Sequence, residues 1–294
     1  YNTVSAHIDS VTRPDASRAG TFEIADGLEV NRMGFGAMRL CGEGIVGPPA
    51  DESHARAVAQ RAVDYGVDFL DTADSYGPGV SERLLREAGV VEDAVVATKA
   101  GLLRNSDTEW LPHGDPDYLK NQALVSRDRL RVDSIDVLQY HRPDPDTPFV
   151  DSVTALAELV ADGLVEYVGL SNVTVNQLDQ APHIVDVVTV QNRYNVGYRD
   201  EQAVLDACEA AGIGFVPWYP LAGGDLDTVT DDLDAVAAAH DATRYQIALA
   251  WLLETSPVTL PIPGTLDLNH LEQNVAAAEI DLSESELRRL DEAV

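Results

Sequence analysis

The stretch Phe69-Leu70-Asp71-Thr72-Ala73-Asp74-Ser75-Tyr76-Gly77 decides how the chain folds and where its chemistry lies. Its first residues are apolar and suit a buried strand, whereas the part from Asp71 to Gly77 is too polar to continue one and ends in glycine. A carboxylate and, five residues later, a phenol therefore follow the carboxyl end of a strand. A second apolar run, Val95 to Thr98, ends in Lys99, and the chain has only two lysines. Both strand ends carry groups suited to proton transfer.

Apolar runs of this kind alternate with helical patterns eight times from Arg32 onward. The helical patterns include 52–65, 117–130, 149–161 and 201–211; two more, 227–240 and 244–254, fall between the seventh and eighth strands, and 284–293 comes last. This alternation predicts an α/β protein with a parallel (β/α)8 barrel, the TIM barrel fold. The expected strands are Arg32–Ala37, Asp68–Asp71, Ala94–Thr98, Ser134–Tyr140, Val165–Leu170, Val187–Val190, Ile213–Pro217 and Thr259–Ile262.

The N-terminal region is expected to lie outside the barrel. Residues 1–19 are polar and lack periodicity, so we predict a flexible arm there and a barrel domain over residues 20–294. Two short alternating runs, 21–25 and 28–30, flank Asp26-Gly27, a dipeptide that favours a tight hairpin turn. The sequence therefore predicts a small β-hairpin cap.

Charge and composition limit the classes of function. The chain has 50 acidic and 20 basic residues and a net charge of −30, which argues against nucleic acid as a partner. Because the acidic residues are scattered, we interpret them as a surface adapted to molar salt, as in a cytoplasmic protein of a halophile; an ordinary acidic protein is the alternative. No apolar run approaches the ~20 residues of a membrane span. Cys41 and Cys208 show no metal-ligand spacing, and we expect no metal and a monomer.

One glycine pattern is misleading. Gly42-Glu43-Gly44-Ile45-Val46-Gly47 matches the dinucleotide-binding fingerprint letter by letter. That fingerprint requires a helix to open directly after the glycines, but Pro48-Pro49 follows here and no acidic residue closes a βαβ unit. We therefore expect a mobile loop.

Polar or aromatic residues recur at the ends of six of the expected strands. Each of them singly has an ordinary explanation, such as a helix cap, a structural ion pair or core packing. In a barrel, however, these ends meet at one mouth, the face where such enzymes place their active sites. The residues are Asp71 with Tyr76, Lys99, His141, Ser171 with Asn172, Gln191 with Asn192, and Trp218 with Tyr219.

From about residue 20 to its end, the chain resembles the aldo-keto reductase family. The resemblance implies NAD(P)H-dependent reduction of an aldehyde or ketone, with Asp71, Tyr76, Lys99 and His141 as the catalytic residues. The bacterial pyridoxal-reductase-like subgroup is the most similar, through the segments 47–49, 110–112 and 217–224. The motifs that carry the resemblance are Gly34–Met38, Asp71–Gly77, Ala97–Lys99, Tyr140-His141, Val168–Asn172, Val190–Asn192, Trp218–Leu221 and Ile262–Thr265.

The residue types suit these roles. A hydride that reaches a carbonyl carbon leaves charge on the oxygen, and Tyr76 is the expected general acid that supplies the proton. Lys99 within ~4 to 6 Å is expected to lower the pKa of the phenol, and Asp71 to keep the lysine charged. His141 can hydrogen-bond the same oxygen.

The resemblance also implies a cofactor site. Ser171, Asn172 and Gln191 would hold the nicotinamide amide and Trp218 would stack on its ring. NADP(H) is favoured and NAD(H) is possible, since Gly264 and His270 stand where many family members have a lysine and an arginine. The implied cofactor contacts are Gly36, Ala37, Met38, Asp71, Ser171, Asn172, Gln191, Trp218, Tyr219, Pro220, Leu221, Gly223, Ile262, Pro263, Gly264, Thr265, His270, Gln273 and Asn274.

The substrate is expected to be a small carbonyl compound, selected by the loops 38–49, 102–114 and 142–148. Met38, Cys41, Trp110 and Trp218 could form an apolar wall of its site. Two other functions stay open. One is a cofactor-binding regulatory subunit of the same fold without significant turnover; the other is metal-assisted hydrolysis, for which the sequence offers no recognisable ligand cluster.

Overall fold

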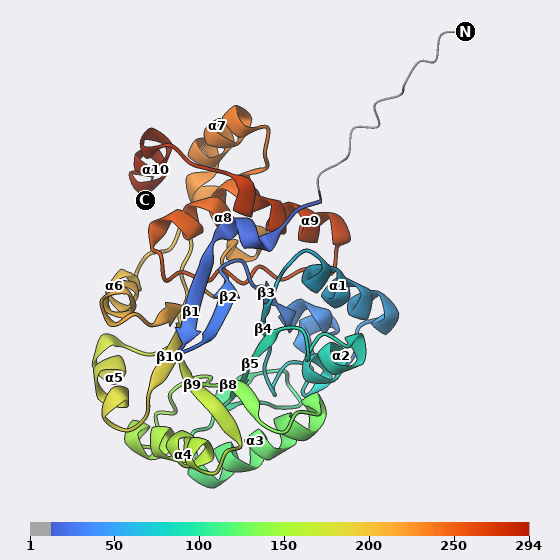
Figure 1. Cartoon of the computed structure of the whole chain (residues 1–294), viewed down its shortest axis with the longest axis vertical. Helices are drawn as coiled ribbons and strands as arrows, with labels where there is room; N and C mark the ends of the chain where they lie inside the picture. Colours follow the sequence, from blue (N-terminus) through green and yellow to red (C-terminus); the bar gives the residue numbers. More distant parts are fainter. Residues whose placement is uncertain (1–12, 294) are drawn as a thin grey trace.

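The expected strands lie side by side in a curled, seven-stranded parallel sheet in the computed structural model, which describes residues 13–293 (Figure 1). The order across the sheet is β11-β10-β9-β8-β5-β4-β3, so neighbours along the chain are neighbours in space. Helices surround the sheet, and the fold class is that of a TIM barrel, as predicted. The strands are β3 (Phe35–Gly36), β4 (Phe69–Asp71), β5 (Val95–Ala100), β8 (Ile135–Tyr140), β9 (Val165–Ser171), β10 (Val187–Gln191) and β11 (Gly214–Phe215).

The segment expected to be the eighth strand closes the barrel without forming a regular strand. On one side, Leu260 N donates to Phe215 O at 2.8 Å. On the other side, Gly34 N donates to Pro261 O at 2.9 Å and Gly36 N to Pro263 O at 3.4 Å. Pro261 and Pro263 have no N–H and cannot donate in return, which interrupts the ladder. The prediction of a regular strand over Thr259–Ile262 is therefore wrong, although the segment lies where the eighth strand was expected.

The helical patterns of the sequence correspond to helices, with each end within three residues of its expected position. Side-chain caps account for several of the starts, such as Asp51, which accepts from His54 N at 2.9 Å. Within residues 13–293, no helix is both long and apolar enough to cross a bilayer. The helices are α1 (Glu52–Asp64), α2 (Val80–Ala88), α3 (Pro116–Leu130), α4 (Phe149–Ala161), α5 (Val175–Gln180), α6 (Gln202–Ala211), α7 (Thr230–His240), α8 (Arg244–Thr255), α9 (Leu268–Ala276) and α10 (Glu284–Asp291).

The predicted hairpin is present and covers one end of the barrel. Strands β1 (Thr21–Ala25) and β2 (Leu28–Asn31) pair antiparallel, and in Figure 1 they cross in front of the sheet. Ile24 and Val30 of the hairpin are buried, and they belong to one cluster with inward-facing residues from around the barrel. The hairpin thus fills the amino end of the barrel, and the carboxyl ends of the strands remain for the active site. The barrel residues of this cluster are Phe69, Ala97, Val137, Val188, Val216, Leu260 and Ile262.

The expected flexible arm is only partly covered by the structure. Residues 1–12 lie outside the described part of the chain. Residues 16–19 form a short 3₁₀ helix, in which Ala16 is fully buried and its N–H donates to Tyr65 O at 2.8 Å. The prediction of a flexible segment is therefore wrong for these residues, because a small apolar residue and a backbone hydrogen bond attach them to the end of α1.

Two of the loops after the strands contain structure that the sequence did not indicate. Strands β6 (Leu102–Arg104) and β7 (Trp110–Pro112) form an antiparallel hairpin. The glycine-rich segment 42–47 is a loop, as predicted, with a single 3₁₀ turn and a bridge from Val46 to Gly77. Both segments contact the turn that carries Tyr76.

Candidate active site

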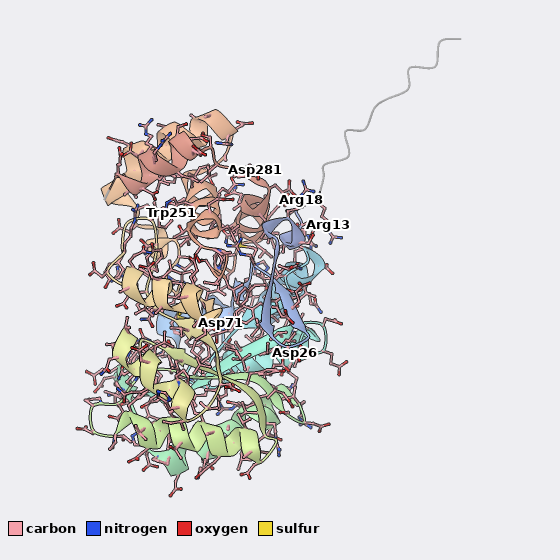
Figure 2. The ribbon with its side chains drawn as sticks, turned by 60° about the vertical axis from the view of Figure 1, so that its left-hand side comes forward. Arg13, Arg18, Asp26, Asp71, Trp251 and Asp281 are labelled. Carbon is pink, nitrogen blue, oxygen red and sulfur yellow. The ribbon has the colours of Figure 1, made fainter. Side chains whose placement is uncertain are left out.

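The strand ends bring the four expected catalytic residues together near the centre of the molecule, where Figure 2 labels Asp71. Asp71 is the last residue of β4, and the turn that follows is held against β5 by backbone bonds from Thr72 N to Ala97 O at 2.8 Å and from Asp74 N to Lys99 O at 3.1 Å. This pairing places the two strand ends in register. Tyr76 therefore lies directly above Lys99.

Lys99 is completely buried, and its ammonium group has three acceptors. Nζ lies 2.6 Å from Asp71 Oδ1, 2.8 Å from Thr72 O and 3.2 Å from Tyr76 Oη. A buried charge with every donor used is far less costly than an unpaired one. Since the lysine donates to the phenol oxygen, the phenol proton is free to be donated elsewhere.

The second oxygen of Asp71 is held by two side-chain amides. Gln139 Nε2 donates to Oδ2 at 3.0 Å and Gln191 Nε2 at 2.7 Å. Gly169 makes room for this arrangement, because a Cβ there would lie 2.7 Å from Gln139 Cγ. The sequence interpretation missed Gln139, although a polar residue inside the apolar run 135–140 was a usable signal.

The phenol of Tyr76 is protonated at neutral pH. Burial raises its pKa above 10, the Lys99 ammonium opposes this, and the Asp71 carboxylate adds to the rise. Lys99 thus acts to lower the pKa of the phenol, as expected, but burial outweighs the lysine and the net shift is upward. For Lys99 itself, burial acts to lower the pKa, but Asp71 and Tyr76 more than compensate and the net shift is upward. The pair is thus a protonated phenol beside a charged ammonium.

His141 follows β8 and is 7% exposed. Burial, together with the charges of Lys99 and Arg142, holds the pKa of His141 well below 6.5, so its imidazole is neutral. Its Nδ1 lies 3.4 Å from Ser75 Oγ, and the tautomer with the proton on Nε2 lets Nδ1 accept there. Nε2 is then a hydrogen-bond donor. The imidazole ring lies 5.9 Å from the Tyr76 ring, edge to face.

Among the expected substrate contacts, Trp110 packs against two of the catalytic residues. Its ring contacts those of Tyr76 and His141, with centroids 6.2 and 6.5 Å away. Cys41 is buried beside the turn, and Met38 is partly buried against the core. Trp218 Nε1 donates to Asn172 Oδ1 at 3.1 Å, and Asn172 Nδ2 donates to His141 O at 3.0 Å. That the four residues form one apolar wall stays a prediction.

The expected nicotinamide contacts include a strained segment of backbone. Asn172 is in the left-handed conformation with φ of 58°, and its Nδ2 donates to Ser171 Oγ at 2.9 Å and to His141 O at 3.0 Å. Tyr219 and Ala222, in the turn after β11, also have positive φ values of 62° and 50°. Non-glycine residues rarely adopt this conformation, and such strain gathers at ligand sites.

The other expected cofactor residues lie in three parts of the structure. Gly36 and the segment 262–264 are in backbone contact, and a Cβ on Gly264 would lie 2.3 Å from Gly36 O. A lysine therefore does not fit at position 264 without moving β3. His270, Gln273 and Asn274 lie on α9, where Asp267 already caps the helix by accepting from two backbone N–H groups. The remaining contacts, Ala37, Pro220, Leu221, Gly223 and Thr265, lie in the loops after β3, after β11 and before α9.

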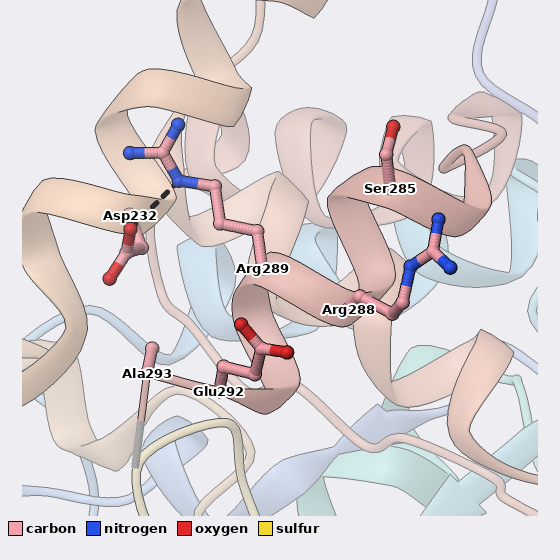
Figure 3. A pocket seen from close by; sticks show the side chains of 6 residues that line it. All are labelled: Asp232, Ser285, Arg288, Arg289, Glu292 and Ala293. Atoms are coloured by element: carbon pink, nitrogen blue, oxygen red, sulfur yellow. Dashed lines mark hydrogen bonds and ion pairs between the residues drawn. The ribbon is translucent and has the colours of Figure 1, made fainter.

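A surface hollow lies between α7 and α10 (Figure 3). Its Arg289 pairs with Asp232 at 2.7 Å, and none of its residues belongs to a strand end. We therefore assign it no part in the active site. It is lined by Asp232, Ser285, Arg288, Arg289, Glu292 and Ala293.

Known proteins of one family match almost the whole chain. A model of the Aldo/keto reductase family matches residues 32–294. A Schizosaccharomyces pombe protein described as an uncharacterized oxidoreductase is 48% identical over 279 residues, which cover 95% of this chain and 91% of that one. Escherichia coli pyridoxine 4-dehydrogenase is 41% identical over 271 residues, covering 89% and 94%. An aldo-keto reductase from Klebsiella pneumoniae, solved in complex with NADP and acetate, is 27% identical with a TM-score of 0.79, covering 92% of this chain and 94% of that one.

Proposed function

Because the chain belongs to the aldo/keto reductase family, we propose that this NAD(P)H-dependent oxidoreductase reduces an aldehyde or ketone to an alcohol with Tyr76 as the general acid. The observation that carries the proposal is the position of Lys99. This fully buried ammonium group contacts both the phenol of Tyr76 at 3.2 Å and the carboxylate of Asp71 at 2.6 Å. The ammonium group can stabilise the phenolate that forms when Tyr76 donates its proton to a carbonyl oxygen.

Tyr76 supplies the proton at the oxygen of the substrate. The cofactor, when bound, supplies the hydride to the carbonyl carbon. As the phenol proton leaves, the charge that develops on Tyr76 Oη lies 3.2 Å from Lys99 Nζ, in a site shielded from water. An opposite charge at this distance stabilises the phenolate, and more so in a buried site than in water. Asp71 positions the lysine and balances its charge.

His141 orients the carbonyl group. Its neutral imidazole can donate a hydrogen bond from Nε2 to the same substrate oxygen that receives the proton from Tyr76. Removing this one donor should reduce turnover less than removing the phenol does, because the proton itself would still be supplied.

The residues present fit a nicotinamide cofactor. The hydroxyl of Ser171 can donate to a carboxamide, and the amide oxygens of Asn172 and Gln191 can accept from it, since their N–H groups are used by Asp71, Gln139, His141 and Ser171. The indole of Trp218 can cover one face of a flat ring. We propose NADP(H) rather than NAD(H), supported by the NADP bound to the Klebsiella pneumoniae relative. The glycine at position 264 and the histidine at 270 leave this preference without the usual cationic contacts.

The substrate that we propose is a pyridoxal-like aromatic aldehyde, because the 41% identical Escherichia coli relative is a pyridoxine 4-dehydrogenase. Trp110 beside Tyr76 and His141 provides an aromatic surface next to the proton donor. Another small carbonyl compound, such as a sugar aldehyde or methylglyoxal, is the alternative that a substrate panel separates.

We also propose that the protein works as a monomer in the cytoplasm of a cell with concentrated salt. The support is the net charge of −30 and the scarcity of lysine. The chain has only two lysines, and one of them, Lys99, is buried. Acidic side chains repel one another strongly in dilute buffer, and the repulsion is screened when the Debye length falls to ~3 Å in molar salt.

The test is Tyr76→Phe, assayed with NADPH and with NADH against a panel of carbonyl compounds in molar KCl. General acid catalysis typically contributes about 10²- to 10⁴-fold, so we expect kcat to fall by that factor while NADPH still binds. Tyr167→Phe, on the half-buried part of β9, is the matched control and should keep full activity. Unchanged turnover of Tyr76→Phe would refute the mechanism. A wild-type protein that binds NADPH but reduces no carbonyl compound would favour the regulatory alternative.

A further inference from the structure

Three backbone carbonyls beside the active site accept hydrogen bonds from one side chain, Arg104. Gly44, Ile45 and Thr108 all have left-handed backbone, with φ of 66°, 61° and 64°. Arg104 Nη1 donates to Ile45 O at 3.0 Å, and Nη2 donates to Gly44 O at 2.8 Å and to Thr108 O at 2.9 Å. Isoleucine and threonine are β-branched, and this conformation is a genuine outlier for such residues. It persists where surrounding contacts enforce it, and such strain is characteristic of functional sites.

The same guanidinium group stacks on Trp110. Its Cζ lies 3.8 Å from the centre of the indole ring, and the two residues are direct partners in the β6–β7 ladder. Arginine is well suited to this position, because its planar group can stack on a ring and donate to several acceptors at once. Arg104 thus covers one face of Trp110.

A second set of contacts connects the loop 43–47 to the proton donor. Gly77, the residue after Tyr76, donates from its N–H to Ile45 O at 3.1 Å and accepts from Gly47 N at 3.0 Å. Trp110 in turn contacts the Tyr76 ring. Arg104 therefore contacts Tyr76 indirectly by two routes. One runs through Trp110, and the other runs through Ile45 and Gly77. Arg104 thus connects the hairpin that carries Trp110 to the loop that contacts Gly77.

We propose that Arg104 is a positioning residue that determines substrate class, because it fixes Trp110 as the surface on which the ring of an aromatic carbonyl substrate stacks. This inference rests on the function proposed above for Tyr76. A planar ring can gain a stacking contact with the indole of Trp110, whereas a three-carbon aldehyde has no ring to place there. Arg104 itself contacts the tryptophan and the loops and takes no part in proton transfer.

The test compares benzaldehyde with propanal in Arg104→Met, which keeps an unbranched but shorter side chain and removes its donors. We expect kcat/KM for benzaldehyde to fall about tenfold, mainly through KM, and kcat/KM for propanal to stay within about twofold. Lysine can donate but cannot reproduce the planar group, so Arg104→Lys should give an intermediate loss, and it carries the test if Arg104→Met does not fold. Arg13→Met, at a site 61% exposed, is the control for the loss of one charge and should change neither substrate.

Two further measurements separate this role from general damage. The double variant Arg104→Met/Trp110→Ala should lose no more benzaldehyde activity than Trp110→Ala alone, because the two residues act together. Acrylamide quenching of Trp110, obtained as the difference from a matched Trp110→Phe protein, should increase in Arg104→Met. Equal losses for both aldehydes, additive losses in the double variant or unchanged quenching would each overturn the proposal. If the wild type reduces no aldehyde at all, the proposed function fails, while the quenching still tests the contact between Arg104 and Trp110.

Discussion

Replacing Gln139 by methionine tests how much the ion pair under Tyr76 depends on its amide partners. Gln139 is fully buried, and its Nε2 donates to Asp71 Oδ2 at 3.0 Å. Methionine has nearly the same length and fills the same space in the barrel, but it cannot donate. The substitution therefore removes one hydrogen bond from a buried carboxylate, together with the longer contact in which Gln139 Oε1 accepts from Gln191 Nε2 at 3.4 Å.

The expected magnitude follows from what Asp71 retains. A hydrogen bond to a charged group contributes about 1.5 to 3 kcal/mol. Asp71 keeps Lys99 at 2.6 Å and Gln191 at 2.7 Å, so we expect the lower part of this range, about 1.5 to 2 kcal/mol in the free energy of unfolding. For a chain of this size, about 2 to 4 °C in Tm accompanies each kcal/mol, so Tm should fall by roughly 3 to 8 °C. We expect kcat/KM to fall about tenfold as Asp71 and Lys99 lose their fixed geometry.

The assay is urea denaturation in molar KCl together with steady-state kinetics. Thr189→Val is the matched control in the same part of the barrel, because Thr189 Oγ1 is buried and has no hydrogen-bond partner among the described residues. Deleting an unpaired buried hydroxyl should be neutral or stabilising. A Gln139→Met protein as stable and as active as the wild type would show that Lys99 and Gln191 alone hold Asp71, and would refute the reasoning.

Two further predictions concern stability. Burial and the charge of Glu82 raise the pKa of Asp74 to about 7. Folding therefore favours the protonated carboxyl group, and the stability that this protonation contributes is lost as the pH rises from about 4 to about 7. Asp74→Asn should therefore gain stability relative to the wild type between pH 4.5 and pH 8 in urea denaturation, and a pH-independent difference would contradict the assignment. The charge of −30 predicts that molar KCl raises Tm above its value in dilute buffer. A Tm that salt leaves unchanged or lowers would refute the proposed adaptation to salt.

The local sequence was enough to predict much of the fold, because strands and helices each repeat apolar residues with a characteristic period. The alternation of apolar runs with helical patterns predicted the barrel, and the hairpin around Asp26-Gly27 followed from turn chemistry. The polar residues at strand ends predicted which side chains would meet, since the carboxyl ends of parallel strands in a barrel converge on one face. The structure accordingly brings Asp71, Tyr76, Lys99 and His141 together.

The tertiary structure alone decided matters that depend on distance and burial. The net direction of the Tyr76 pKa shift required knowing that burial outweighs Lys99, and the closure of the barrel through Pro261 required the neighbouring strands. Gln139 and Arg104 acquired their importance from partners 68 and about 60 residues away. A hydrogen bond or a stacked ring depends on the final positions of both groups, and sequence periodicity reports only which face of a strand or helix each group occupies.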